Sequence, residues 1–111
     1  MQLESKKLLQ DVLNALDLLE QFVERKTLED YQGEAMLRAA VEREFEIVGE
    51  ALKQLADRDL PTATLIPELR RIIAFRNVLI HGYAEVDNKV VWEALTTRVI
   101  PLKALVRSIL R

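Results

Sequence analysis

Apolar residues recur at helical spacing along almost the whole chain, and this periodicity constrains the fold more than any other feature. The first segment carries a single apolar stripe with polar residues between its members, as an amphipathic helix does. The stripe consists of Leu9, Val12, Leu13, Leu16, Leu19 and Val23. Glu20 falls towards one side of it, so we expect this acid to reach solvent at the rim or to meet a basic partner. No segment sustains the alternation of a strand, and the sequence therefore predicts an all-α fold.

Capping and breaking residues divide the first half of the chain. The first helix should fade near residue 25, and Thr27-Leu28-Glu29-Asp30 has the form of a capping box, a hydroxyl followed three residues later by an acid. Gly33 should separate this short piece from a long helix over about residues 34 to 56. Gly49 lies inside that helix, where glycine costs ~1 kcal/mol against alanine, and a close helix contact would explain it.

The second half of the chain is divided in the same way. Residues 57 to 62 read as the clearest loop, and a helix should begin near Pro67, since proline suits a first helical turn. This helix has more apolar residues than one face needs, which predicts burial on two sides. Gly82 fits the position just past its end, where positive φ is common. Asp87 can cap the last helical region, which Pro101 should kink or split. The architecture expected is an up-down four-helix bundle with a fifth short helix.

Length and composition narrow the functional classes. With 111 residues the chain should form one domain, residues 1 to 111, with a hydrophobic core large enough to be stable without disulfide bonds or metal ions. It has no cysteine and one histidine, and no spacing suggests a metal site or calls for a cofactor. No apolar run approaches the ~18 residues of a membrane span, and the first residues do not resemble a secretory signal. We therefore expect a cytoplasmic protein.

The charge of the chain bears on nucleic-acid binding. A net charge of −2 argues against a general, sequence-blind nucleic-acid binder, which would carry excess lysine and arginine. It leaves room for a local basic cleft, because Arg70, Arg71 and Arg76 lie close together in the sequence. Arg70 and Arg71 could contact RNA, or they could form part of a solvated face.

The single histidine marks the segment that carries most of the chemistry. His81 lies five residues after Arg76 and two before Tyr83. At ~100° per residue Asn77 and His81 share a helix face, whereas Arg76 is rotated from His81 by roughly 140°. Arg76 and His81 could therefore converge only at a frayed helix end or from different subunits.

These side chains suit phosphate chemistry. The planar fork of an arginine binds two phosphate oxygens, and a histidine at a helix C-terminus can hold and donate a proton. RNA supplies its own nucleophile, the 2′-OH, so cleavage would need no metal. One histidine cannot easily serve as acid and base at once, but a two-fold dimer would bring two to one site. Structural interpretations remain open: His81 as a cap, Arg76 in an ion pair, Tyr83 in the core, and Glu50 paired with an arginine near the cleft.

The motif resembles that of a known family. Arg76-Asn77-x-x-x-His81-x-Tyr83 is similar to the R-x4-H-x-Y signature of HepT-type HEPN proteins. Residues 47 to 51 resemble the family's I-G-E-A segment, the sequence from 86 to 92 resembles the stretch after its tyrosine, and residues 100 to 102 resemble its apolar-proline ending. The likeness covers nearly the full length, in order. Val48 and Leu69 depart from the residues common in the family, and neither touches the proposed chemistry.

This resemblance implies a HEPN-like helical-bundle homodimer with a composite cleft. It implies a metal-independent endoribonuclease, the toxin of a type VII-like toxin–antitoxin system, whose partner is an MntA-like nucleotidyltransferase. On this basis Arg76 binds the scissile phosphate, His81 is the acid–base residue, Asn77 orients, and Tyr83 receives AMP from the partner. The alternative is a non-catalytic subunit that helps a minimal nucleotidyltransferase to hold its substrate. A plain structural bundle is the third hypothesis.

Overall fold

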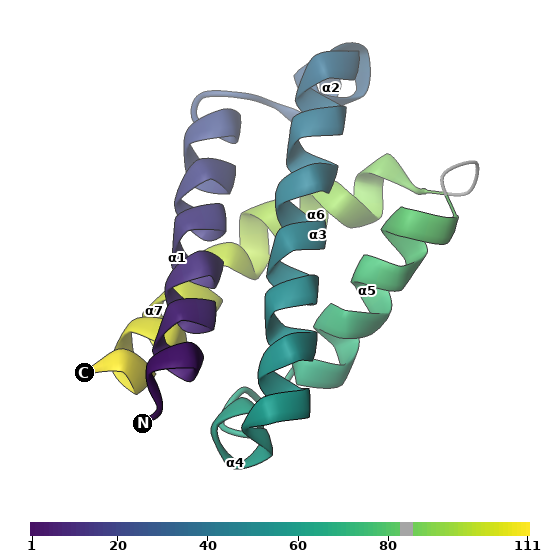
Figure 1. Ribbon diagram of the computed structural model, residues 1–111. Helices are drawn as coiled ribbons and strands as arrows, with labels where there is room; N and C mark the ends of the chain where they lie inside the picture. Colours follow the sequence, from purple (N-terminus) through teal and green to yellow (C-terminus); the bar gives the residue numbers. More distant parts are fainter. Residues whose placement is uncertain (83–85) are drawn as a thin grey trace.

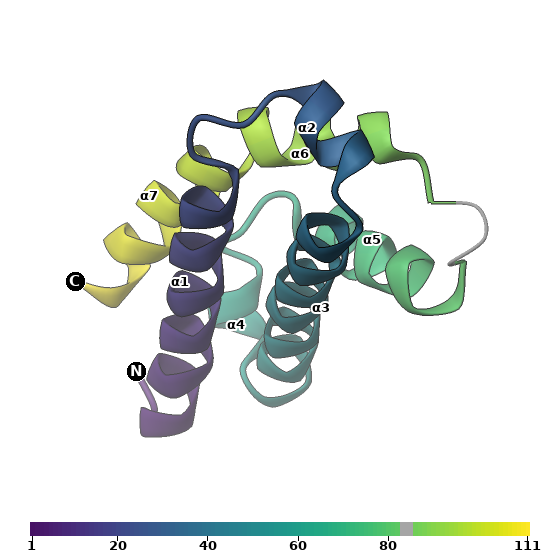
Figure 2. The same ribbon diagram turned by 90° about the horizontal axis from the view of Figure 1, so that it is seen from above.

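Seven α-helices are present in the computed structural model, which describes residues 1–82 and 86–111. They are α1 (Leu3–Val23), α2 (Leu28–Gly33), α3 (Ala35–Arg58), α4 (Leu60–Ala63), α5 (Leu69–His81), α6 (Asn88–Thr97) and α7 (Val99–Leu110). Helix α3 lies between α1 and α5 (Figure 1). Helices α6 and α7 form a bent arm that passes behind α3 and α1 in Figure 1, and Figure 2 shows the bend and α7 beside α1. The all-α prediction is confirmed. The expected fifth, short helix is α2, and the last helical region is split, which was one of the two alternatives for Pro101. Helix α4 is the one that the sequence did not predict.

The core lies between α1, α3 and the bent arm, and it contains the residues that the periodicity selects. The buried members of α1 include Leu9, Val12, Leu13, Leu16 and Leu19, and those of α3 include Val41, Phe45, Val48, Leu52 and Leu55. Full burial of one such side chain stabilises the fold by about 1.5–3 kcal/mol. Glu20 meets a basic partner at the rim of this core, since its carboxylate lies 2.8 Å from Nζ of Lys103 on α7.

Local sequence signals set several helix ends correctly. The capping box is complete: the backbone N–H of Asp30 donates to the hydroxyl of Thr27 at 3.1 Å, and that of Thr27 donates to the Asp30 carboxylate at 2.9 Å. Asp87 caps α6 by accepting from the backbone N–H of Lys89. Pro101 splits the last helical region, because it cannot donate to the carbonyl of Thr97, the residue at which α6 ends.

The prediction of a loop over residues 57 to 62 was wrong, because most of this segment is helical. Helix α3 continues through Arg58, and α4 begins at Leu60. The side chain of Asp59 makes this possible, because it accepts from the backbone N–H of Thr62 at 3.3 Å and caps α4. The buried hydroxyl of Ser5 donates to the same carboxylate at 2.7 Å. The hydrogen bonds from Thr62 and Ser5 hold the pKa of Asp59 below its ordinary value.

Both ends of α5 differ in detail from the expectation. The helix begins at Leu69, two residues after Pro67. Gly82 has φ −109°, so the expected positive φ was wrong. A close approach accounts for the glycine instead, since a Cβ on Gly82 would lie 2.9 Å from the carbonyl oxygen of Val78. Within the ranges described, no helix has the length and apolar character that crossing a membrane requires.

A buried hydroxyl gives a stability prediction. Tyr31 is completely buried against Trp92, with ring centroids 5.7 Å apart, and its hydroxyl has no hydrogen-bond partner among the described residues. Because an unpaired buried hydroxyl costs about 1–3 kcal/mol, Tyr31→Phe should raise the free energy of unfolding by about 1 kcal/mol. Urea denaturation would measure this change. A loss of stability would show that the hydroxyl has a partner and would contradict the prediction.

Candidate functional site

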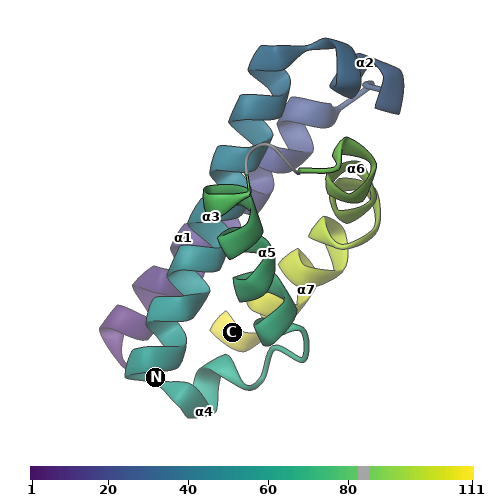
Figure 3. The same cartoon turned by 90° about the vertical axis from the view of Figure 1, so that its right-hand side faces the viewer.

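Helix α5 carries the candidate site and rests on α3. Leu69 and Leu79 are buried, and Ile72, Ile73 and Phe75 are partly buried against the core. Figure 3 shows α5 running beside α3, with the α6–α7 arm on its other side. Packing against α3 fixes how the helix is rotated, and therefore fixes the direction of every polar side chain on it.

Arg76 points towards α3, where it meets Glu50. Nη2 of its guanidinium lies 2.6 Å from Oε2 of Glu50, and Nη1 donates to Oδ1 of Asn77 at 3.0 Å. The side chain of Arg76 is 21% exposed and that of Glu50 is 43% exposed. Pairing of Glu50 with an arginine of the motif, one of the alternatives from the sequence, is therefore observed.

Gly49 allows Arg76 to occupy this position. A Cβ built on Gly49 would lie 2.3 Å from Cβ of Arg76 and 2.8 Å from its Cγ, distances that real side chains do not adopt. The prediction that Gly49 marks a close helix contact is confirmed. The contact is made with the arginine of the motif itself.

His81, Asn77 and Arg70 lie on a second face of α5. All three are exposed, and helical geometry places them within about 40° of one another. His81 is the last residue of α5 and remains helical, so the helix does not fray to bring it towards Arg76. Within one chain the structure joins Asn77 to Arg76 but turns His81 to a different side. Tyr83 lies outside the described residues.

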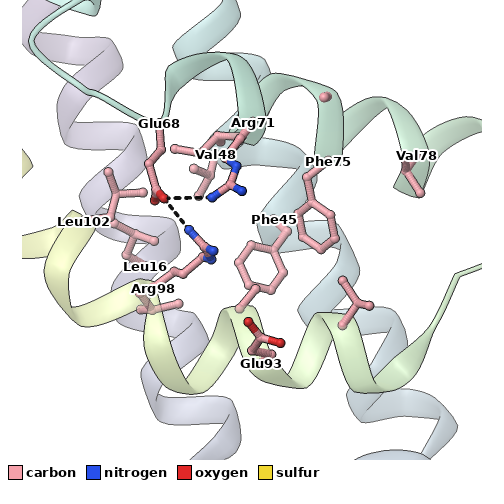
Figure 4. A pocket seen from close by; sticks show the side chains of 15 residues that line it. Leu16, Phe45, Val48, Glu68, Arg71, Phe75, Val78, Glu93, Arg98 and Leu102 are labelled. Carbon is pink, nitrogen blue, oxygen red and sulfur yellow. Dashed lines mark hydrogen bonds and ion pairs between the residues drawn. The ribbon is translucent and has the colours of Figure 1, made fainter.

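Arg71 points elsewhere, into an apolar groove between α5 and α6. Figure 4 shows Glu68 bound by Arg71 and by Arg98, and the rings of Phe45 and Phe75 beside each other farther along the groove. Nη1 of Arg71 lies 3.4 Å from the Glu68 carboxylate, and the hydrogen bond from Arg98 holds the pKa of Glu68 below its ordinary value. Of the two predicted RNA contacts, only Arg70 therefore shares a face with His81.

The groove has a volume of about 390 Å³ and is lined mainly by apolar side chains. Val78 on α5 and Val90 on α6 stand at it with half of their surfaces exposed. We expected α5 to be buried on two sides, but only the side that packs against α3 is buried, and the other side lines the open groove. The surplus of apolar residues on α5 was the sequence signal for this second surface.

The chemistry available at the site is that of an arginine, an amide and an imidazole. In the part of the chain that the structure describes, no cluster of three or more histidine, cysteine or carboxylate side chains could hold a metal ion. The arginine can bind a phosphate and the imidazole can transfer a proton, which together suit phosphodiester cleavage.

Comparisons with known proteins agree with one another. The family model described as "Ribonuclease HepT-like" matches residues 12–109, which include all of α5. The chain is 33% identical over 100 residues to a protein of Thermococcus cleftensis named "Probable ribonuclease HepT", covering 88% of each chain. It is 29% identical over 103 residues to a protein of Caldanaerobacter subterraneus named "Putative RNase", covering 93% of this chain and 91% of the relative. No solved structure matches the chain.

Proposed function

The chain belongs to the HepT-like ribonuclease family, and from this premise we propose that it is a metal-independent endoribonuclease, the toxin of a toxin–antitoxin pair. One observation carries the proposal: the family match spans the segment with Arg76, Asn77, His81 and Tyr83. The geometry agrees with it, because Arg76 is anchored at a helix contact while His81 is open to solvent at the end of the same helix.

The reaction assigns a separate task to each side chain. The 2′-OH of the RNA attacks the adjacent phosphorus, forming a 2′-O–P bond as the P–O5′ bond breaks. A base takes the proton of the 2′-OH, and an acid gives a proton to the departing 5′ oxygen. Arg76 holds the phosphate and stabilises its additional negative charge, Asn77 orients Arg76, and His81 transfers protons. Arg70, on the same face of α5 as His81, contacts the phosphate backbone of the RNA.

We propose that two copies of the chain form the working site. Each chain has one histidine, and Arg76 and His81 point to different sides of α5. The apolar groove offers a surface for the second copy, since half-exposed Val78 lies one turn before His81 and would become buried there. Light scattering should give the molar mass of a dimer. A purely monomeric protein would contradict this part of the proposal.

RNA cleavage by the free protein tests the activity. The purified chain is incubated with structured and single-stranded RNA in the presence of EDTA. We expect cleavage that leaves a 2′,3′-cyclic phosphate on one product and a 5′-OH on the other. An RNA whose 2′-OH at the cut position is replaced by hydrogen should stay intact there. If the all-ribose RNA also remains whole, the ribonuclease proposal is wrong.

Tyr83 is the residue at which we propose that the toxin is switched off. The partner would be an MntA-like nucleotidyltransferase that transfers AMP from ATP to the Tyr83 hydroxyl, with release of pyrophosphate. Incubation with that partner and ATP should add the mass of one AMP to the wild-type chain and abolish RNA cleavage. Tyr83→Phe should gain no such mass, as intact-protein mass spectrometry would show. Equal labelling of the Tyr83→Phe variant would place the modification on another residue.

A further inference from the structure

We propose that Glu50 is a positioning residue of the ribonuclease site, which holds the guanidinium of Arg76 in the orientation that receives the phosphate. This inference rests on the proposed function and adds a residue of α3 to a site otherwise built from α5. Glu50 is one turn of helix from Gln54 and directly follows Gly49, and all three take part in the arrangement.

The contacts form a chain that ends at Arg76. Nε2 of Gln54 donates to Oε1 of Glu50 at 3.2 Å, which turns the other carboxylate oxygen, Oε2, towards Arg76. Oε2 lies 2.6 Å from Nη2 of the guanidinium. Because Gly49 has no side chain, the aliphatic stem of Arg76 can lie directly against α3. The stem and the charged end of Arg76 are thus both held by the same turn of α3.

The guanidinium keeps donors for a phosphate while it is held. Glu50 faces Nη2 and Asn77 accepts from Nη1, and each of these nitrogens carries two N–H groups. One N–H on each terminal nitrogen therefore remains for the two oxygens of a phosphate. Nε is buried without a hydrogen-bond partner among the described residues, so it lies within the packed part of the side chain and is not a donor to the substrate.

A role in stability alone does not account for Glu50. Its side chain is 43% exposed, and ion pairs between partly exposed side chains contribute about 0–1 kcal/mol. The oxygen that faces Arg76, Oε2, is buried and makes no hydrogen bond of good geometry among the described residues, so the contact is one of charge. Positioning is far more sensitive, since displacement of a reacting group by about 1 Å can lower a rate about 100-fold. The carboxylate also repels RNA, so an acid at this place must contribute something other than affinity.

Two variants separate these effects. Glu50→Ala removes the contact with Arg76 and should lower kcat about 10- to 100-fold. Glu50→Gln keeps an acceptor oxygen at the same reach and should recover most of the rate. Binding of a non-cleavable RNA, with a 2′-deoxy sugar at the cut position, should be unchanged or tighter in both variants because a negative charge is lost. Wild-type kcat in Glu50→Ala, or a loss explained by weaker RNA binding, would overturn the proposal.

A matched control and an independent readout complete the test. Glu44→Ala removes the same charge from α3 about 120° away from Glu50 and should leave kcat unchanged. ¹⁵N relaxation of the Arg76 Nε–H signal, assigned through its loss in Arg76→Lys, should report a rigid side chain in the wild type and a mobile one in Glu50→Ala. If the wild type fails to cut RNA, the ribonuclease proposal fails, and this relaxation measurement alone decides whether Glu50 holds Arg76. Equal order in both proteins would refute the positioning role.

Discussion

His81→Ala is expected to lower the rate of RNA cleavage by about 10²- to 10⁴-fold, the contribution typical of a positioned acid–base group. His81 is the only imidazole in the chain. It ends α5 with its side chain exposed, where a substrate can reach it. Single-turnover cleavage of a labelled RNA, with EDTA present, would measure the loss. Unchanged cleavage by the variant would remove His81 from the mechanism.

The same variant tests whether the loss is chemical. An exposed residue at a helix end contributes little to stability, so His81→Ala should change the free energy of unfolding by less than about 0.5 kcal/mol. Circular dichroism would check that the variant is folded, and urea denaturation would measure its free energy of unfolding. If the chain is instead a non-catalytic partner subunit, neither protein will cut RNA, and both will bind the nucleotidyltransferase equally well.

Mixed dimers give a sharper form of the experiment. If a single composite site needs the histidines of both chains, dimers with one His81→Ala chain will be inactive. Refolding equal amounts of wild type and variant together should then leave about one quarter of the wild-type activity, since only that fraction of dimers has both histidines. About one half would remain if each chain acted alone, and that result would exclude the composite site.

The sequence predicted the helices well where their ends depend on neighbouring residues. Thr27 and Asp87 cap the helices that follow them, because a cap is formed within one turn. The segment around Asp59 was misread as a loop because it is polar and contains a proline. Its helical form depends on tertiary structure, since Ser5, 54 residues away in sequence, donates to the carboxylate that caps α4.

The site shows the same division between local and tertiary information. Helical geometry alone predicted that Arg76 and His81 point to different sides of α5, and the structure agrees. The same arithmetic would have separated Arg71 from Arg70, which adjacent numbering made appear as a pair. The surplus of apolar residues on α5 indicated a second apolar surface, but its form as an open groove could not be predicted, because that depends on where α6 lies relative to α5.

Gly49→Ala is expected to damage both the fold and the site. Alanine is intrinsically the better helix former by about 1 kcal/mol, so propensity alone would make the variant more stable. The added methyl would lie 2.3 Å from Cβ of Arg76 and 3.4 Å from the carbonyl oxygen of Ile72, so α5 must move away from α3. Overpacking of this kind costs about 1–3 kcal/mol, which exceeds the gain at the upper end. The net loss should be up to about 2 kcal/mol, measured by urea denaturation.

The displacement caused by this methyl should affect catalysis more strongly than it affects folding. Moving Arg76 by about 1 Å would take its guanidinium away from Glu50 and lower kcat by about 100-fold, in protein that is still folded. Gly33→Ala is the matched control, because a Cβ there meets nothing within 4 Å and the residue lies at the end of α2. That variant should retain its activity and lose no stability. If Gly49→Ala proved as active and as stable as Gly33→Ala, the close contact between Gly49 and Arg76 would have no part in the site.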